Sequence, residues 1–245
     1  VAVVGGGNTA IDAARTAIRL GAEQVNLVYR RTRQDMPATD LEIEEALEEG
    51  MVLQTLVNPT AILGNGHAQK LELVRQDLGE FDASARRRPM PIEGSEFTIK
   101  ADVVIAAIGQ STDVDCVGEC GVAFHRNTTA QVERDLATTR AGVFAAGDVV
   151  LGPATVVEAV AQGNEVATTV DAYLREGEAG EAATLEEYDD LAVSWNMEAY
   201  GDATRAEMPV QDPIERRTNW REVELGFSEL ACREECKRCL RCDLE

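Results

Sequence analysis

The chain has 245 residues, of which 44 are acidic and 23 basic, so its formal net charge is −21. Such an acidic excess argues against nucleic acid and against anionic membranes as partners. The hydrophobic fraction of 44% supports one large or two modest domains. There is no apolar stretch of about 18 residues and no visible signal peptide, so we expect no membrane span and a cytoplasmic location.

The first ten residues, V-A-V-V-G-G-G-N-T-A, predict a buried strand that leads through a glycine turn into a helix. The turn fits the dinucleotide fingerprint G-x-G-x-x-G/A. In this motif the first glycine allows the tight turn and the second lets the backbone approach a pyrophosphate. The third small residue lets the helix pack closely on the strand. The helix N–H groups then face the phosphates. The cofactor-binding positions of this motif are Gly5, Gly7, Asn8, Thr9 and Ala10.

Strands and helices alternate over the first 50 residues, which indicates the start of a doubly wound α/β unit. The first helix carries apolar residues at helical spacing and stops at Gly21. In the second, Thr39 and Glu42 have capping-box spacing and Gly50 ends the helix. The predicted elements are strand 1–4, helix 8–20, strand 25–29 and helix 39–49.

From residue 51 to residue 100 short alternating segments predict a small antiparallel meander. Its turn signals are Asn58-Pro59, Gly64-Asn65-Gly66 and Glu93-Gly94. Further along, apolar runs predict buried strands over 102–108 and 143–146, followed by a helix over about 154–174. The stretch 201–222 has few apolar residues and predicts an extended arm.

The second strand ends in Tyr29-Arg30-Arg31-Thr32-Arg33, where an NAD site would place an acidic residue. Guanidinium groups at this position can hold a 2′-phosphate by charge-assisted, bidentate hydrogen bonds. We therefore expect NADP(H) rather than NAD(H), with Arg30 and Arg31 as ligands. The alternative is a solvated basic strand end.

A second strand–turn–helix pattern lies in T-T-R-A-G-V-F-A-A-G-D-V-V-L-G-P-A-T-V-V-E-A-V-A-Q-G, residues 138–163. An exposed Asp148 after the strand can accept hydrogen bonds from ligand hydroxyls. The N-terminus of the following helix favours negative charge. A purely structural aspartate is the equal alternative from the residues alone.

This stretch resembles the second flavin-binding motif of the glutamate synthase small-subunit family of FAD-dependent pyridine nucleotide oxidoreductases. G-G-G-N-T-A-I-D-A-A-R, V-Y-R-R-T-R-Q-D-M-P-A and V-I-A-A-I-G-Q are similar to its other signatures, so the resemblance covers nearly the whole chain. It implies that Asp148 binds the flavin ribityl chain and that the following helix points at the flavin pyrimidine. The implied flavin-site residues are Gly147, Asp148, Thr155 and Val156, with Gly109 and Gln110 near the flavin or at a hinge.

In that family the flavin domain is split around the NADP domain, and its first half carries a separate fingerprint that this sequence lacks. We therefore interpret the chain as the carboxyl-terminal part of such a protein and expect weak FAD binding, or none, by the chain alone. The predicted layout has four parts. They are an NADP-binding domain with a β meander over 1–100, the second half of the FAD domain over 101–175, an extended arm over 176–231 and a Cys-rich segment over 232–245.

Four of the six cysteines lie in the last fourteen residues, with the spacing C-x3-C-x2-C-x2-C. This clustering favours metal or redox chemistry over a disulfide scaffold. We predict a [4Fe–4S] cluster, with zinc as a less favoured occupant. Alternatively, the last two cysteines bind with ligands beyond residue 245, or all four are reduced thiols on an amphipathic helix. The predicted ligands are Cys232, Cys236, Cys239 and Cys242.

Cys116 and Cys120 are interpreted as lone thiols rather than a redox pair, because no basic neighbour lowers their pKa. His67 and His125 are expected at the surface. No Ser/His/Asp arrangement stands out, so no catalytic side chain is assigned; hydride transfer between cofactors requires none.

These patterns predict an NAD(P)H-dependent flavin and iron–sulfur oxidoreductase subunit. Electrons would pass from NADPH through FAD to iron–sulfur clusters and then to a partner, either a glutamate synthase large subunit or a ferredoxin-type protein. One alternative is the reverse flow in a ferredoxin-linked or bifurcating NAD(P)+ reductase. Another is a non-catalytic NADP-binding sensor or scaffold, which would need the fingerprint but not the flavin motif.

Overall fold

The structure is a computed structural model that describes residues 1–81, 86–114, 121–125, 128–176 and 204–238. These residues form two compact units. The first contains Val1–Ile108 together with Val193–Glu245, and the second contains Gly109–Ala192. No helix in the described ranges is long and apolar enough to cross a membrane.

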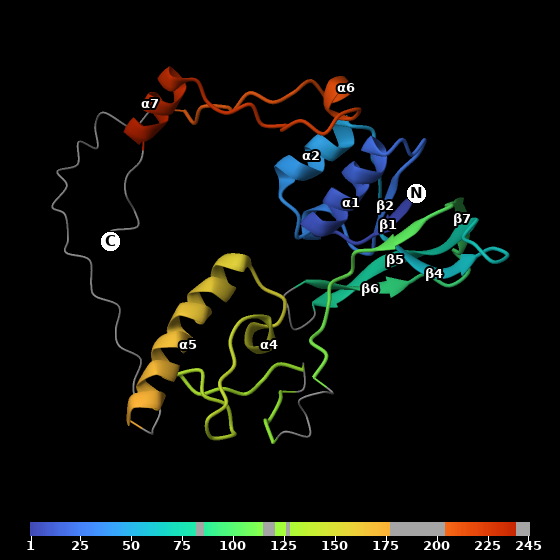
Figure 1. Cartoon of the computed structure of the whole chain (residues 1–245). Helices are drawn as coiled ribbons and strands as arrows, with labels where there is room; N and C mark the ends of the chain where they lie inside the picture. The colour runs from blue at the N-terminus through green and yellow to red at the C-terminus, as the bar shows by residue number, and fades with distance from the viewer. Residues whose placement is uncertain (82–85, 115–120, 126–127, 177–203, 239–245) are drawn as a thin grey trace. The chain divides into compact units, whose positions relative to one another are not determined.

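The first unit is built on a four-stranded parallel sheet in the order β3-β2-β1-β8. Figure 1 labels two of its strands, β1 and β2, beside α1 and α2. Each neighbouring pair is in parallel register; for example, Val3 pairs with Leu27 on one side and Ile105 on the other. The alternating pattern at the start of the chain thus gives the expected α/β unit with a Rossmann-like parallel sheet. Its elements are β1 Ala2–Val4, α1 Asn8–Arg19, β2 Asn26–Tyr29, the 3-10 helix η1 Arg33–Asp35, α2 Asp40–Glu48, β3 Val52–Thr55 and β8 Val104–Ala106.

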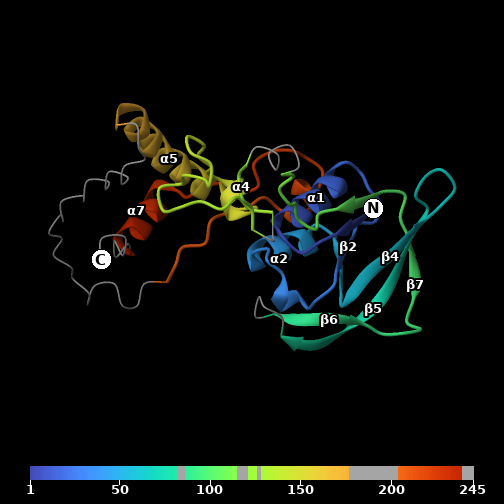
Figure 2. The ribbon, with the colours of Figure 1, turned by 90° about the horizontal axis from the view of Figure 1, so that it is seen from below.

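An antiparallel sheet forms a further layer of this unit, and Figure 2 shows it apart from α1 and α2. The central strand β5 pairs with β4, β6 and β7. One apolar cluster fills the space between the parallel sheet and the two helices, and a second, including Val28 and Leu71, joins the parallel sheet to the antiparallel one. The strands are β4 Val57–Leu63, β5 Lys70–Phe81, β6 Arg87–Pro91 and β7 Phe97–Lys100.

Two of the three predicted meander turns are present, and the one at Asn58-Pro59 is wrong. These two residues lie inside β4, next to a register shift between Pro59 and Ala61. Proline lacks an N–H donor, but a strand that pairs on one side only, beside a bulge, tolerates it. β4 pairs with β5 alone among the described strands, which satisfies that condition.

The second unit has less regular structure around α4, Asp148–Leu151, and α5, Val156–Glu176. Its extended segments meet in isolated antiparallel bridges such as Ala137 with Phe144. The buried strand predicted over 143–146 is therefore wrong, because a strand needs a continuous ladder and the described neighbours offer one bridge. Phe144 instead packs edge-on against Tyr173 of α5, with ring centroids 5.5 Å apart.

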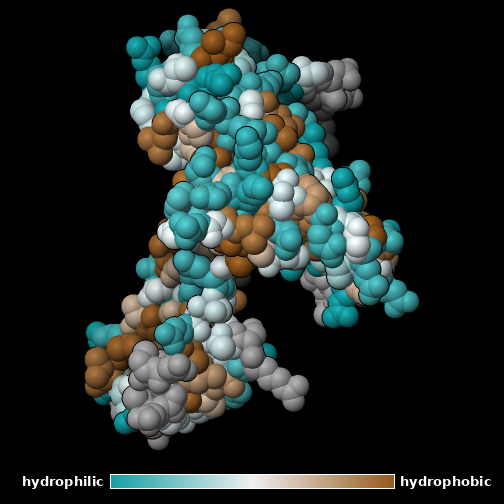
Figure 3. All heavy atoms as spheres, turned by 90° about the vertical axis from the view of Figure 1, so that its right-hand side faces the viewer, coloured by the Kyte–Doolittle hydropathy of each residue, from teal (hydrophilic) through white to brown (hydrophobic). Residues whose placement is uncertain are grey.

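The chain returns to the first unit in an extended segment over residues 204–228, which we call the arm. The arm contains the one-turn helix α6, Pro213–Arg216, and leads into α7, Glu229–Arg238. The predicted bounds of an extended arm stay a prediction, because residues 177–203 lie outside the described residues. The face of the molecule in Figure 3 carries both hydrophilic and hydrophobic side chains.

Candidate functional site

In the glycine loop between β1 and α1, neighbouring atoms leave no room for a side chain at Gly5 or Gly6, but they leave room at Gly7. A Cβ on Gly5, whose φ is +148°, would stand 2.2 Å from the carbonyl oxygen of Ala107. A Cβ on Gly6 would lie 2.5 Å from the Tyr29 ring, whereas one on Gly7 would meet no atom within 4 Å. The first two glycines are required by packing, and the space at Gly7 is open to a ligand.

Helix α1 begins beside this open space. Its N-cap is Gly7, which has no side chain to cap the helix, and its first turn carries no acidic residue. Asn8 and Thr9 are exposed, while Ala10 is fully buried and packs closely on the sheet. The unsatisfied N–H groups and the positive end of the helix dipole therefore make this turn suitable for an anion.

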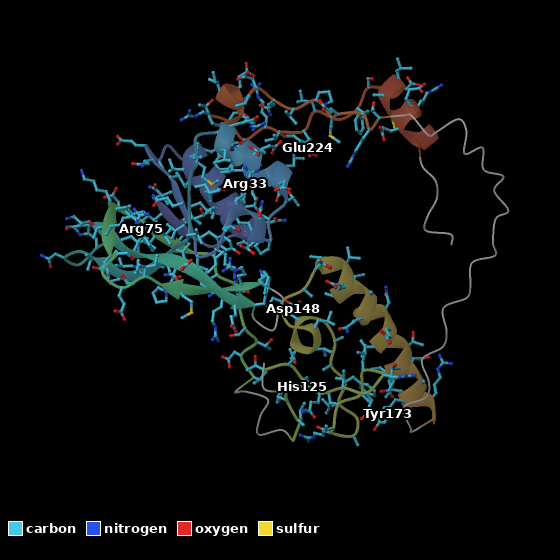
Figure 4. All side chains as sticks on the ribbon, turned by 180° about the vertical axis from the view of Figure 1, so that it is seen from behind. Arg33, Arg75, His125, Asp148, Tyr173 and Glu224 are labelled. Carbon is cyan, nitrogen blue, oxygen red and sulfur yellow. The ribbon has the colours of Figure 1, made fainter. Side chains whose placement is uncertain are left out.

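The two arginines predicted to bind a 2′-phosphate have different environments at the end of β2. Arg30 is exposed. Arg31 is only 5% exposed, and its Nε donates a hydrogen bond of 2.8 Å to the carbonyl oxygen of Arg87 on β6. Arg33, labelled in Figure 4, forms an ion pair with Glu44 at 2.5 Å. Arg30 is thus placed to meet an anion, and Arg31 holds β6 against the end of β2.

The segment after β2 is bonded back onto the glycine loop. The Tyr29 hydroxyl donates to the carbonyl oxygen of Asp35 at 2.7 Å, and the Ala38 N–H donates to the carbonyl oxygen of Gly6 at 3.1 Å. Thr32 and Asp35 form a capping box at η1. Sequence reasoning missed this packing of Tyr29 and Ala38, although the spacing of Thr32 and Asp35 signals the capped turn.

The predicted flavin-binding motif also depends on a glycine, Gly147, whose backbone conformation other residues rarely adopt. Gly147 has φ +75° and ψ −149°, and its N–H donates to Oε1 of Gln162 on α5 at 2.7 Å. Asp148 is exposed and starts α4 rather than following a ladder strand. Gln162 was not identified from sequence; its side chain fixes the turn that presents Asp148.

Three predicted flavin-site residues meet at a pocket of about 480 Å³ in the second unit. Figure 4 shows Asp148 beside the amino-terminal end of α5. Gly109 and Gln110 are exposed at the start of the unit and do not line this pocket. The lining residues are Asp148, Ala154, Thr155, Val156, Ala159 and Val160.

The start of α5 carries an acidic residue, unlike the start of α1. Thr155 and Glu158 form a reciprocal capping box, in which the Glu158 carboxylate accepts from the Thr155 hydroxyl at 2.7 Å and from its N–H at 2.8 Å. These two hydrogen bonds lower the pKa of Glu158, and the bond from the Thr155 hydroxyl has the larger effect. The box uses the N–H groups of Thr155 and Glu158, so those of Val156 and Val157 remain for a ligand in this turn. A carboxylate here disfavours phosphate and suits a neutral acceptor.

The predicted metal ligands are described only in part. Cys232 and Cys236 are exposed on α7, one helical turn apart. Cys239 and Cys242, like Cys116 and Cys120, lie outside the described residues. Within those residues no group of three or more His, Cys, Asp or Glu side chains could hold a metal ion. The iron–sulfur cluster therefore stays a prediction. His67 and His125 are exposed, as expected.

The family described as pyridine nucleotide-disulphide oxidoreductase matches residues 1–163. The chain belongs to this family. The expected relationship to glutamate synthase small subunits is confirmed, since the small chain of Azospirillum brasilense NADPH glutamate synthase is 41% identical over 178 residues. That alignment covers 71% of this chain and 37% of the relative.

Two other oxidoreductase subunits align with 99% of the chain. One is the NADP(+)-dependent formate dehydrogenase subunit beta of Moorella thermoacetica, 45% identical over 249 residues. The other is the NADPH-Fe(3+) oxidoreductase subunit beta of Geobacter sulfurreducens, 38% identical over 276 residues. The chain spans 35% and 41% of the length of these two relatives.

Solved oxidoreductases share the fold. T. acidophilum thioredoxin reductase superposes with a TM-score of 0.59 at 20% identity, covering 71% of this chain and 52% of that chain. Mycobacterium tuberculosis FprA in complex with NADPH gives a TM-score of 0.55 at 19% identity over the same shares. The α/β class with Rossmann-like elements predicted from the sequence is thereby confirmed.

Proposed function

We propose that this oxidoreductase chain binds NADP(H) and part of an FAD and transfers electrons between them and iron–sulfur centres of a larger enzyme. The observation that carries this proposal is the pair of different helix starts. The start of α1 has an open glycine and no acid, whereas the start of α5 has a capped turn beside a pocket that contains Asp148. The first suits a pyrophosphate and the second a neutral, hydroxyl-bearing ligand.

The residues around the glycine loop fit NADP(H). A Cβ on Gly7 would meet no atom within 4 Å, so there is space for the pyrophosphate, and the N–H groups of Asn8 and Thr9 would donate to it. Exposed Arg30 would bind the 2′-phosphate, with Arg31 behind it holding β6 in place. Ala10 keeps α1 close to the sheet.

The pocket of the second unit fits one end of a flavin. Asp148 would accept hydrogen bonds from ribityl hydroxyls, and the Val156 N–H would donate to a carbonyl of the pyrimidine ring. Thr155 fixes that turn through its bonds with Glu158, and Gly147 sets the position of Asp148. Gly109 and Gln110 would act as the hinge, because the boundary between the two units falls just before Gly109. When bound, FAD supplies the conversion between hydride transfer and single-electron transfer.

The tail would hold a [4Fe–4S] cluster through Cys232, Cys236, Cys239 and Cys242. Relatives named as beta subunits support an obligate protein partner for electron exchange. The two relatives that align with 99% of the chain are named for formate dehydrogenase and Fe(3+) reductase activities, so a partner other than glutamate synthase is equally supported.

The test is anaerobic addition of NADPH to the purified full-length protein, followed by absorbance and electron paramagnetic resonance. We expect the flavin to bleach rapidly with NADPH and more slowly with NADH, and a reduced iron–sulfur signal to follow. A flavin that stays oxidised with both nucleotides would instead support the sensor or scaffold alternative. Normal flavin bleaching without bound iron would remove only the cluster from the proposal.

Reverse electron flow is the second candidate, and one observation favours it. The Moorella relative is named as an NADP(+)-dependent formate dehydrogenase subunit, which supports NADP+ as an electron acceptor for this chain. A reduced ferredoxin-type donor would then supply electrons to produce NADPH. Comparison of NADP+ reduction by reduced ferredoxin with ferredoxin reduction by NADPH, in the same full-length protein, separates the two directions.

A further inference from the structure

The arm consists of two extended segments joined by one isolated antiparallel bridge, and we call this pair of segments the ribbon. One end of the ribbon lies near α7 and the other at α6. Its segments pair through the bridge between Val210 and Glu224, where Figure 4 labels Glu224. The Gln211 N–H also donates to the carbonyl oxygen of Val223 at 2.9 Å. At the α7 end, the Ala206 N–H donates to the Glu235 carboxylate. The ribbon therefore connects the Cys-bearing helix to the tip at α6 by hydrogen bonds as well as through the chain.

The tip of the arm inserts one arginine into the first unit. Arg216 is 1% exposed, although the residues around it in sequence are mostly exposed. Its Nη2 lies 2.8 Å from Oε2 of Glu48 and donates to the carbonyl oxygen of Glu45 at 3.0 Å. Its Nε lies 3.0 Å from Oε1 of Glu49, a fully buried carboxylate. Arg216 thus meets the last turn of α2 from 167 or more residues away in the sequence.

The last turn of α2 requires this cation. Acidic side chains at a helix C-terminus face the negative end of the dipole, and three of them lie there, at Glu45, Glu48 and Glu49. From α1, Arg15 pairs with Glu45 at 2.8 Å and with Glu49 at 2.6 Å, and Arg19 pairs with Glu49 at 2.9 Å. Arg216 supplies the third positive charge, so three arginines balance three glutamates.

The pKa of Arg15 reflects the strength of this network. Burial alone would lower it, but the hydrogen bond and charge of Glu49, together with Glu45, raise it above its ordinary value. Removing one cation from such a buried set leaves a carboxylate without compensation, which costs far more than loss of an exposed pair.

Apolar burial does not explain why the tip docks. Ile214 and Trp220 in the tip are 76% and 65% exposed. Between the arm and α1 there is a pocket of about 240 Å³, so the two are not closely packed there. It is lined by Asp12, Arg15, Thr16, Arg19, Trp220, Arg221 and Val223. Charge pairing at Arg216 is the main contact that holds the tip.

We propose that Arg216 is a positioning residue that docks the arm on α1 and α2 and thereby holds the Cys-bearing helix α7 on the NADP-binding unit. The docking itself follows from the ion network. Its importance for electron transfer rests on the proposed function, because it requires that the tail cysteines bind the cluster. Loss of the Arg216 ion pairs would leave NADPH binding at the other end of α1 intact. It would weaken the attachment of α7 and so slow electron transfer to the tail.

The test is Arg216→Met in the purified full-length protein, with Arg221→Met as the matched control, since Arg221 is an exposed arginine on the same arm. We expect hydrogen exchange of the Gln211 and Leu225 amides, both bonded within the ribbon, to become at least tenfold faster in Arg216→Met and to stay unchanged in Arg221→Met. NADPH affinity should stay within twofold, while the rate of cluster reduction after NADPH addition should fall at least tenfold.

Glu48→Gln provides a second variant if Arg216→Met fails to fold. Glu48 is half exposed, and in the described part of the chain its ion pair is with Arg216, so Arg15 and Arg19 keep their partners. A smaller acceleration of the same amides is expected. Unchanged hydrogen exchange of the Gln211 and Leu225 amides in both variants would show that Arg216 does not dock the arm. Faster exchange with a normal rate of cluster reduction would show that docking by Arg216 does not affect electron transfer. Absence of iron from the wild type would contradict the proposed cluster while the exchange result still decides the docking.

Discussion

The first turns of α1 and α5 in this oxidoreductase differ in their capping and in their charge. At α1 the N-cap is Gly7 and no acid lies in the first turn. At α5 Thr155 and Glu158 close a capping box, and the carboxylate occupies the end where the dipole is positive. A helix start is therefore suited to an anion when its first turn has no acidic residue and no side-chain cap. One acidic residue in the first turn makes the helix start unfavourable for an anion.

The two units also differ in how far they bury their own apolar residues. Both apolar core clusters of the described residues lie in the first unit. In the second, Val156, Val157 and Val160 at the start of α5 are 79%, 77% and 58% exposed. The first unit thus contains two apolar core clusters, whereas the second exposes valines at the start of α5, and Val156 and Val160 line the candidate flavin pocket.

The largest effect is expected from Gly5→Ala. The new Cβ would clash with the Ala107 carbonyl oxygen, and φ +148° is unfavourable for alanine, so we expect a loss of about 3 kcal/mol or more in unfolding free energy. Urea unfolding measures it. The control is Gly7→Ala, where φ is −93° and the space is open, which should cost less than about 1 kcal/mol. Equal losses would show that the open space at Gly7 is not real.

Arg30→Ala should weaken NADPH binding by about 2 kcal/mol, or roughly thirtyfold, without changing NADH binding. Isothermal titration of both nucleotides measures the difference. Arg33→Ala is the control, because Arg33 already pairs with Glu44. If Arg33→Ala weakened NADPH binding more than Arg30→Ala, the assignment of the 2′-phosphate ligand at the end of β2 would move to Arg33.

Asn8→Glu places at α1 the kind of acid that α5 already carries. We expect NADPH affinity to fall by about 1 kcal/mol, or roughly fivefold, at low ionic strength, because the carboxylate competes for the positive helix end. Asn8→Gln has similar size without the charge and should bind normally. Equal affinity in the two variants would contradict the comparison between the helix starts.

Local patterns predicted most of the first unit. The helix over 8–20 and its apolar face follow from 3.6-residue spacing, and Ile11, Ala14 and Ala17 are buried as that spacing requires. Thr39 caps α2 as its spacing with Glu42 indicates. The meeting of Asp148, Thr155 and Val156 at one pocket also follows from a single short motif. Their ligand roles, like the domain boundaries, stay predictions.

Contacts between distant segments could not be predicted from local sequence patterns. E-E-A-L-E-E, residues 44–49, looks like the solvated face of a helix, yet Glu49 is buried because cations come from α1 and from the arm. Nothing local distinguishes Arg216 from its exposed neighbour Arg217. The apolar run 102–108 was likewise expected to be a buried strand, but β8 is only partly buried because β1 is its single described neighbour in the sheet.

The smallest expected effect is a change in the pKa of Glu158, and it tests the comparison of the two helix starts at α5. Bonds from the Thr155 hydroxyl and N–H lower the pKa of Glu158, so its support of the helix start is present above the unfolded-state pKa and is lost as pH falls through the folded-state value. Thr155→Val removes the hydroxyl and should raise this pKa toward its ordinary value, as measured by carbon-13 titration of the carboxyl group. NADPH affinity should not follow this titration, because the first turn of α1 contains no acid. An unchanged pKa in Thr155→Val would mean that the Thr155 hydroxyl does not hold the Glu158 carboxylate at the start of α5.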